Sequence, residues 1–152
     1  MYVVDTGARV LSMSLDSPTL SPLSLDATAC ARSKDVLVLI GLGNSRRNAL
    51  FYPAATPRVV TVGATDEQDR KPRLSTYGAW IPVVAPGQGF MSLLPTFPKN
   101  SPGKGYGQKS GTSMATASVA GLTALLSDTQ RGWSAAAIKV HLERTVVPVG
   151  LG

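Results

Sequence analysis

Residues 36–40 (VLVLI) constrain the fold more than any other part of the sequence. An unbroken aliphatic run of this length suits a strand that is buried on both faces. Parallel sheets covered by helices on both sides contain such strands, whereas a sheet with one wet face alternates apolar and polar residues. The run closes at residues 41–44 (GLGN), whose glycines end the strand. We therefore expect an α/β fold in which helices flank a parallel sheet.

The segments around this run fit the same fold. Residues 8–15 and 58–64 are predicted strands, and residues 80–85 are a short strand that Pro82 should confine to an edge or an irregular position. Residues 20–34 are a predicted helix, with Ser21 as the N-cap and Pro22 in the first helical position. Further expectations are helices over residues 112–126 and 134–144 and a long loop over residues 86–107, which are rich in Gly, Pro and Ser.

Composition excludes several kinds of function. The chain has 152 residues, which is enough for one domain or part of one, and a single Cys, so it has no internal disulfide framework. The apolar run at residues 36–43 is far shorter than the roughly 20 residues that span a bilayer. The net charge is +6, but the basic clusters at residues 46–47 and 70–73 lack any nucleic-acid-binding pattern. We expect neither a membrane nor a nucleic acid as partner.

Ser113 is the strongest candidate for chemistry. It lies between Gly111, which allows a tight turn, and an apolar helix whose first N–H groups and dipole would face it. Such N–H groups can bind an oxyanion, so the position suits a nucleophile. From the local residues alone, a simple N-cap at Thr112 or Ser113 is favoured over a nucleophile.

Residues 111–115 (GTSMA) and 119–121 (VAG) resemble the nucleophile segment of the subtilisin family of serine endopeptidases. Nearly the whole chain shares in this resemblance. Further matching segments follow in the family's order and approximate spacing, at residues 10–15, 36–44, 52–54, 62–64, 75–78 and 84–87. The resemblance implies a subtilisin-like fold acting on peptide or protein substrates.

The resemblance also implies a role for individual residues. Ser113 would be the acyl-forming nucleophile, and the Asn44 side chain would complete the oxyanion hole with the Ser113 N–H. Two segments would line the pocket for the substrate side chain before the scissile bond and pair with the substrate backbone; they comprise Ser14, Leu15 and Asp16, and Gly41, Leu42 and Gly43.

The family's general base and orienting carboxylate have no counterpart in the expected positions. The triad runs Asp, His, Ser along the chain. The single His here is His141, which follows Ser113 in a late amphipathic helix and is expected to be a structural residue. Asp5 stands in a DTG sequence typical of the catalytic Asp, but it lies too close to the strand that begins near Val10. We therefore interpret Gly7 as the end of a short helix and Asp5 as non-catalytic.

These gaps predict that residues 1–152 form the C-terminal half of a subtilase catalytic domain, without its N-terminal strands and inactive alone. A missing N-terminal half is then a candidate partner. Two alternatives stay open. One is a non-catalytic pseudoprotease that binds peptides in the retained groove, and the other is a serine hydrolase of another fold with a different base.

Departures from the family pattern affect two further features. Asp16 stands where relatives usually have Gly beside the substrate groove. Pro82 stands where relatives often carry an Asp that helps to bind calcium. No cofactor is therefore expected, beyond at most a weak calcium site of backbone carbonyls near Ala54, Thr56 and Val59. The family also implies secretion.

Overall fold

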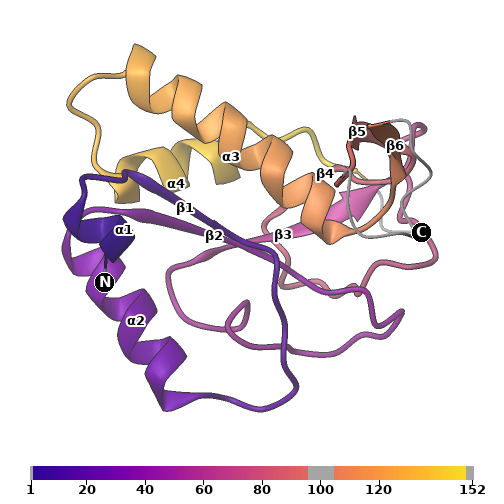
Figure 1. Ribbon diagram of the computed structural model, residues 1–152, viewed down its shortest axis with the longest axis horizontal. Helices are drawn as coiled ribbons and strands as arrows, with labels where there is room; N and C mark the ends of the chain where they lie inside the picture. Colours follow the sequence, from indigo (N-terminus) through magenta and orange to yellow (C-terminus); the bar gives the residue numbers. More distant parts are fainter. Residues whose placement is uncertain (1, 96–104, 150–152) are drawn as a thin grey trace.

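The parallel sheet is present (Figure 1). The computed structural model describes residues 2–95 and 105–149. Four strands lie in the order β1-β2-β3-β4, every neighbouring pair is parallel, and β2 and β3 are buried along their whole length. Their bounds are Val10–Met13 (β1), Leu37–Gly41 (β2), Val60–Thr65 (β3) and Val83–Pro86 (β4). Strand β4 lies at an edge of the sheet, as Pro82 predicts, but it begins after this proline rather than at residue 80.

The predicted helices form close to their expected bounds. Ser21 is the N-cap of its helix, as predicted, since its hydroxyl accepts the Ser24 N–H. The Ser134 hydroxyl caps the last helix in the same way by accepting the Ala137 N–H. In the described part of the chain no helix combines the length and apolar character needed to cross a bilayer. The helices are Tyr2–Asp5 (α1), Pro22–Ser33 (α2), Thr112–Thr129 (α3) and Ala135–Thr145 (α4).

The core lies on both faces of the sheet, which explains why residues 36–40 are continuously apolar. Alternate side chains of this segment point to opposite faces. On one face, Leu37 and Leu39 pack in a cluster with residues of α3 and α4. On the other face, Val38 and Ile40 pack with Ala31 of α2. Figure 1 shows α2 and α3 on opposite sides of the strands.

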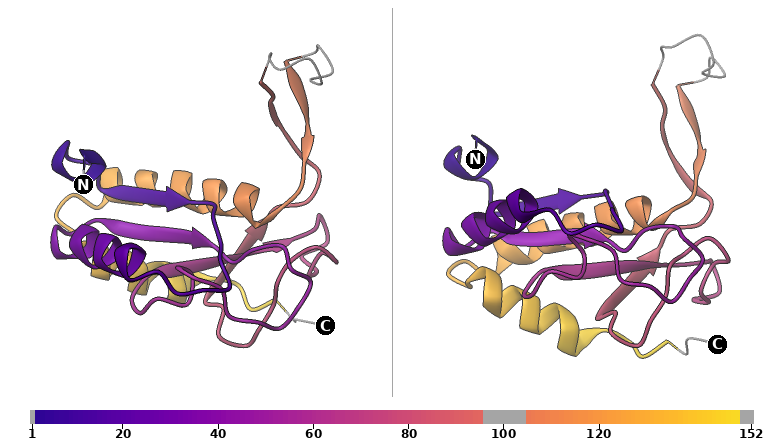
Figure 2. Two further views of the ribbon diagram at one scale, coloured as in Figure 1. Left: turned by 60° about the horizontal axis from the view of Figure 1, so that its bottom comes forward. Right: turned by 90° about the horizontal axis from the view of Figure 1, so that it is seen from below.

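The prediction of a long loop over residues 86–107 is wrong in part. A β-hairpin replaces much of it, formed by β5 (Phe90–Leu93) and β6 (Tyr106–Lys109) in antiparallel register. Figure 2 shows the hairpin projecting away from the body of the protein. The hairpin does not pack against the core, so neither of its strands needs the apolar pattern of a buried strand. The Gly, Pro and Ser content of the segment therefore favoured a loop over a hairpin. Part of the predicted loop, residues 96–104, lies outside the described residues.

Helix α3 is buried on one side only, although its small residues predict close packing in an interior. Among the described residues, the side facing the sheet carries Thr116 and Thr123, whose hydroxyls bond to the carbonyls four residues earlier. The opposite side exposes Leu122 and Leu125, which are 50% and 66% accessible. Leu122 and Leu125 therefore point away from the sheet, and this face of α3 is open.

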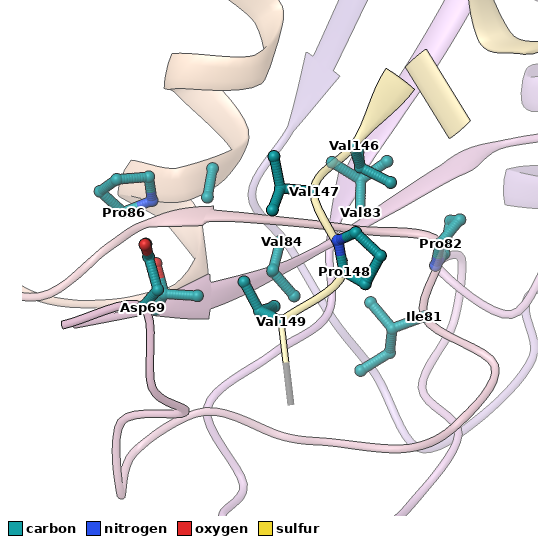
Figure 3. A pocket seen from close by; sticks show the side chains of 12 residues that line it. Asp69, Ile81, Pro82, Val83, Val84, Pro86, Val146, Val147, Pro148 and Val149 are labelled. Carbon is teal, nitrogen blue, oxygen red and sulfur yellow. The ribbon is translucent and has the colours of Figure 1, made fainter. Parts of the chain in front are cut away.

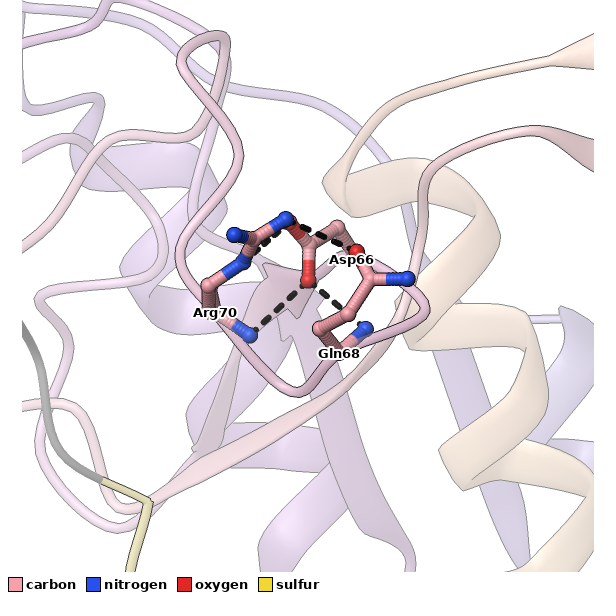
Figure 4. A network of polar contacts seen from close by, with 3 residues as sticks. All are labelled: Asp66, Gln68 and Arg70. Carbon is pink, nitrogen blue, oxygen red and sulfur yellow. Dashed lines mark hydrogen bonds and ion pairs between the residues drawn. The ribbon is translucent and has the colours of Figure 1, made fainter.

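The turn after β3 is held by Asp66 (Figure 4). One carboxylate oxygen accepts the backbone N–H groups of Gln68 and Arg70, and the other accepts the Arg70 side chain at 3.1 Å. The backbone N–H of Arg70 is the main reason why the pKa of Asp66 lies below its usual value. Arg70, one of the basic residues in the cluster at 70–73, is thus paired within the protein.

We expect the chain expressed alone to self-associate, because the open face of α3 lies beside β1, an edge strand of the sheet. The substitution Leu125→Lys should shift the protein toward monomer in size-exclusion chromatography with light scattering. Leu23→Lys is the matched control, because Leu23 is 78% exposed on α2, away from this face, and should leave the distribution unchanged. A wild-type chain that is monomeric at all concentrations would contradict the prediction.

The Asp66 turn should make stability depend on pH in a defined direction. Because the folded pKa of Asp66 is lowered, its contribution is complete above the unfolded value of about 3.9 and is lost as pH falls through the folded pKa. Asp66→Asn should therefore lower the melting temperature near pH 7, and the difference from wild type should shrink below pH 4. Glu67→Gln, a neighbouring exposed carboxylate, should change little; an equal effect would contradict the assignment.

Candidate active site

The predicted site residues meet at the carboxyl edge of the parallel sheet. Residues 14–16 follow β1, and residues 42–44 follow β2. Loops at this edge of an open α/β sheet are the usual place for ligands. Helix α3 also begins here, because the Gly111 N–H donates to the carbonyl of Gly87, the residue directly after β4, at 2.8 Å.

Asn44 is bonded to the start of α3. Its side-chain oxygen accepts the Thr112 N–H at 3.0 Å, and the Thr112 hydroxyl accepts the Gly43 N–H at 3.1 Å. These two bonds join segments that are far apart in the sequence. The first bond also fixes the orientation of the Asn44 amide, because only its oxygen can accept the Thr112 N–H. The Asn44 NH₂ group makes no hydrogen bond within the described residues.

Ser113 is half-buried in the first turn of α3. The Thr112 N–H is bonded to Asn44, and the Met114 N–H donates to the Gly111 carbonyl at 3.1 Å. Within the described residues the Ser113 N–H has no acceptor, as is usual for a donor in the first turn of a helix. Two free donors, the Ser113 N–H and the Asn44 NH₂, thus lie at the same helix start.

Residues at the end of β1 reach the same place. The Ser14 hydroxyl donates to the Ser113 carbonyl at 3.3 Å. Leu15 and Asp16 follow, and both are exposed. Gly41, Leu42 and Gly43 are buried behind them. The structure therefore brings both predicted pocket segments into contact with the start of α3.

Comparisons with known proteins identify the family of this chain. A profile described as "Subtilase family" matches residues 1–151. The chain belongs to the subtilase family. Subtilisin BL of Lederbergia lenta is 37% identical over 146 residues, and thermitase of Thermoactinomyces vulgaris is 37% identical over 144 residues. The alignments cover 96% and 95% of this chain, but only 52% and 48% of the two relatives.

Solved subtilase-like structures share the fold. A cold-adapted subtilisin-like serine proteinase superposes with a TM-score of 0.82 at 31% identity, over 94% of this chain and 50% of that one. The prenylagaramide maturation protease PagA superposes with a TM-score of 0.84 at 27% identity, over 98% of this chain and 55% of that one. This subtilase chain thus spans about half the length of the proteins that it matches.

His141 and Asp5 have structural partners in this subtilase. His141 is half-buried on α4, where its ring contacts Trp133 edge to face with centroids 5.2 Å apart. Asp5 ends α1 and pairs with Lys34 on the surface; the hydrogen bond from Lys34 holds the pKa of Asp5 below its usual range. Gly7 follows with φ +89°, as expected of a glycine that ends a helix.

The residues of the expected weak calcium site do not fit a calcium ion well. The Ala54 carbonyl already accepts a hydrogen bond from the Thr61 hydroxyl at 2.7 Å. Glu143 lines a cavity together with Ala54, Thr56 and Val59, but its carboxylate is paired with Lys139. Among the described residues the buried Thr56 hydroxyl has no hydrogen-bond partner, but a single neutral hydroxyl adds little to a site for calcium, which takes six to eight oxygens. In residues 2–95 and 105–149 no group of three or more His, Cys, Asp and Glu side chains could hold a metal ion.

A separate cavity of about 480 Å³ lies between β4 and the segment that follows α4 (Figure 3). Its walls are mainly apolar, with Val83 and Val84 on one side and Val147 and Pro148 on the other. Among its described lining residues, Asp69 alone carries a charge. None of the predicted site residues lines this cavity, so it is not the groove that the resemblance implies.

Sequence reasoning missed the supporting role of two threonines. The bare backbone of Gly41 lies against the hydroxyls of Thr112 and Thr116; a Cβ there would lie 3.0 Å from Thr116 Oγ1 and 3.4 Å from Thr112 Oγ1. Helix α3 can approach β2 this closely only because residue 41 has no side chain. The signal in the sequence is the four-residue spacing of the threonines, which places both on one face of a helix.

We expect Gly41→Val to be destabilising by about 1–3 kcal/mol, because the added side chain overpacks this contact. The measurement is equilibrium unfolding in urea. Gly121 is the matched control, since it lies on the open face of α3 and a Cβ there meets nothing within 4 Å. Gly121→Ala should stabilise by about 0.5–1 kcal/mol. Equal stability of wild type and Gly41→Val would contradict the proposed close approach.

Proposed function

We propose that this chain carries the nucleophile half of a subtilisin-like serine endopeptidase. Ser113 forms the acyl-enzyme, and the Asn44 side chain and the Ser113 N–H donate to the oxyanion. The observation that carries the proposal is the pair of free donors at the start of α3, beside the Ser113 side chain. An N-cap role alone would not leave a second donor, the Asn44 NH₂, beside that N–H.

The chemistry follows from these positions. The Ser113 oxygen attacks the scissile carbonyl, its proton passes to a base, and the carbonyl oxygen becomes an anion. The two donors stabilise this anion; removal of one such donor costs about 10²–10³ in kcat, a value measured on a subtilisin. The C–N bond then breaks, the base returns its proton to the leaving amine, and water later releases the acyl group.

The base is the missing component. His141 is the single His, and its ring is engaged with Trp133 on α4. In a subtilisin, loss of the His alone costs about 2 × 10⁶ in kcat, as much as loss of the whole triad. We therefore infer that the chain is inactive by itself.

A partner that supplies the His and Asp is the simplest completion of the site. The open face of α3, with Leu122 and Leu125 exposed, supports this proposal because exposed apolar faces of this kind mark surfaces that bind another protein. The edge strand β1 could extend its sheet with strands of the same partner. An N-terminal half of subtilase type would provide both the strands and the base.

Peptide or protein substrates would bind as an added strand between residues 14–16 and residues 41–43. The alternative is a non-catalytic module that binds peptides in this groove and never cleaves them, which the engagement of His141 with Trp133 favours for the isolated chain. By analogy with the family, we also propose that the protein is secreted.

A serine-reactive fluorophosphonate probe tests the need for an added base. We expect the isolated chain to label no faster than its Ser113→Ala variant, because the Ser113 hydroxyl has no base to take its proton. Subtilisin BL serves as the positive control for the probe. Rapid labelling at Ser113, located by mass spectrometry of the peptides, would show that the chain is active by itself and would contradict the proposal.

Calcium should bind weakly or not at all near Ala54. Isothermal titration of the chain with calcium should show no binding at micromolar concentrations, because Pro82 supplies no carboxylate and Glu143 is occupied by Lys139. A Pro82→Asp variant should bind more tightly than wild type. Tight calcium binding by the wild-type chain would overturn this expectation.

A further inference from the structure

Asp16 extends from the end of β1 to the end of β2. If Gly43 had a Cβ atom, that atom would lie 2.8 Å from the Asp16 Oδ2 and 3.1 Å from its Cγ. The carboxylate thus rests directly against the bare α-carbon of Gly43. Gly43 itself has φ +98°, a conformation that favours glycine, so this space is kept open by the backbone as well.

This contact places a negative charge between the two segments proposed to line the pocket. One segment is tied to the nucleophile through the Ser14 hydroxyl, and the other through Asn44. A substrate side chain that enters between them must pass the Asp16 carboxylate. The inference rests on the proposed function, because those segments are assigned to the groove there.

In the part of the chain that the structure describes, the Asp16 carboxylate forms no ion pair. Within residues 2–95 and 105–149 no Lys, Arg or His nitrogen lies within the 4.0 Å ion-pair distance of it, although Arg46 and Arg47 follow Asn44 in the chain. Other acidic side chains of the protein do form ion pairs: Asp5 with Lys34, Asp66 with Arg70, Asp128 with Arg131 and Glu143 with Lys139. In a chain of net charge +6, an unpaired carboxylate in the groove is a ready partner for a cation from outside.

We propose that the groove selects a basic substrate side chain, Lys or Arg, whose cationic head pairs with Asp16. The aliphatic stem of such a side chain would lie between residues 14–16 and residues 41–43, and its charged head would reach the carboxylate. An acidic side chain in the same place would be repelled. Asp16 is therefore a specificity-determining residue.

The test measures binding of short peptides to the immobilised full chain by surface plasmon resonance, so that self-association does not interfere. Three acetylated tetrapeptides differ only in their last residue, which is Lys, norleucine or Glu. We expect the Lys peptide to bind about two- to tenfold more tightly than the norleucine peptide at low salt, as suits a charge pair near the surface. The Glu peptide should bind most weakly, and the preference should shrink at 1 M salt.

Three variants identify the cause. Asp16→Asn and Asp16→Gly should both lose the preference for the Lys peptide over the norleucine peptide. Asp26→Asn removes the same charge from an exposed position on α2 and should retain the preference. Circular dichroism checks that each variant is folded.

The possible failures are distinguishable. If no peptide binds at millimolar concentration, the proposed groove is wrong and this inference is wrong with it. If the three peptides bind equally well to the wild type, the groove stands and the role of Asp16 is wrong. A preference for Lys that persists in both Asp16 variants would also overturn the inference, because the cation would then be bound elsewhere.

Discussion

The rest of the site depends on the contact between the end of β2 and the start of α3. Asn44 and Gly43 each form a hydrogen bond with Thr112, and the bare backbone of Gly41 lets the helix lie against the strand. These short contacts orient the first turn of α3 and leave the Ser113 N–H free. Because β2 ends in a glycine, the N-terminal end of α3 can lie against the strand. Ser113 is in the first turn of that helix, where the helix dipole is positive.

The same contact explains how a chain that spans about half the length of its subtilase relatives can hold Ser113 and Asn44 together. The strands and helix that hold Ser113 and Asn44 all belong to this chain, and their core occupies both faces of the sheet. In the function that we propose, the groups that would activate Ser113 do not. That proposal separates oxyanion binding, which uses a backbone N–H and one side-chain amide, from nucleophile activation, which requires groups of a partner.

Much of the fold was predictable because its signals are local. The continuous hydrophobicity of residues 36–40 is enough to predict a strand that is buried on both faces. Ser21 followed by Pro22 predicts a helix start, because Ser caps the first turn and Pro fits its first position. The hairpin of β5 and β6 was not predictable, since it buries too little surface to impose a pattern. For the site, sequence resemblance indicated Ser113 and Asn44, but the orientation of the Asn44 amide and the contact between Asp16 and Gly43 depend on segments that meet only after folding.

The hydrogen bond between Gly87 and Gly111 has a consequence for how this protein can vary. The chain leaves the body of the protein at Gly87 and returns to it at Gly111, so this hydrogen bond holds the two ends of the intervening segment together. The entropic cost of lengthening a segment whose ends are held in this way rises only with the logarithm of its length. Segments of different size and composition could therefore be exchanged here while the start of α3 keeps its place, and this makes the hairpin a natural site for grafting a new recognition element beside the groove.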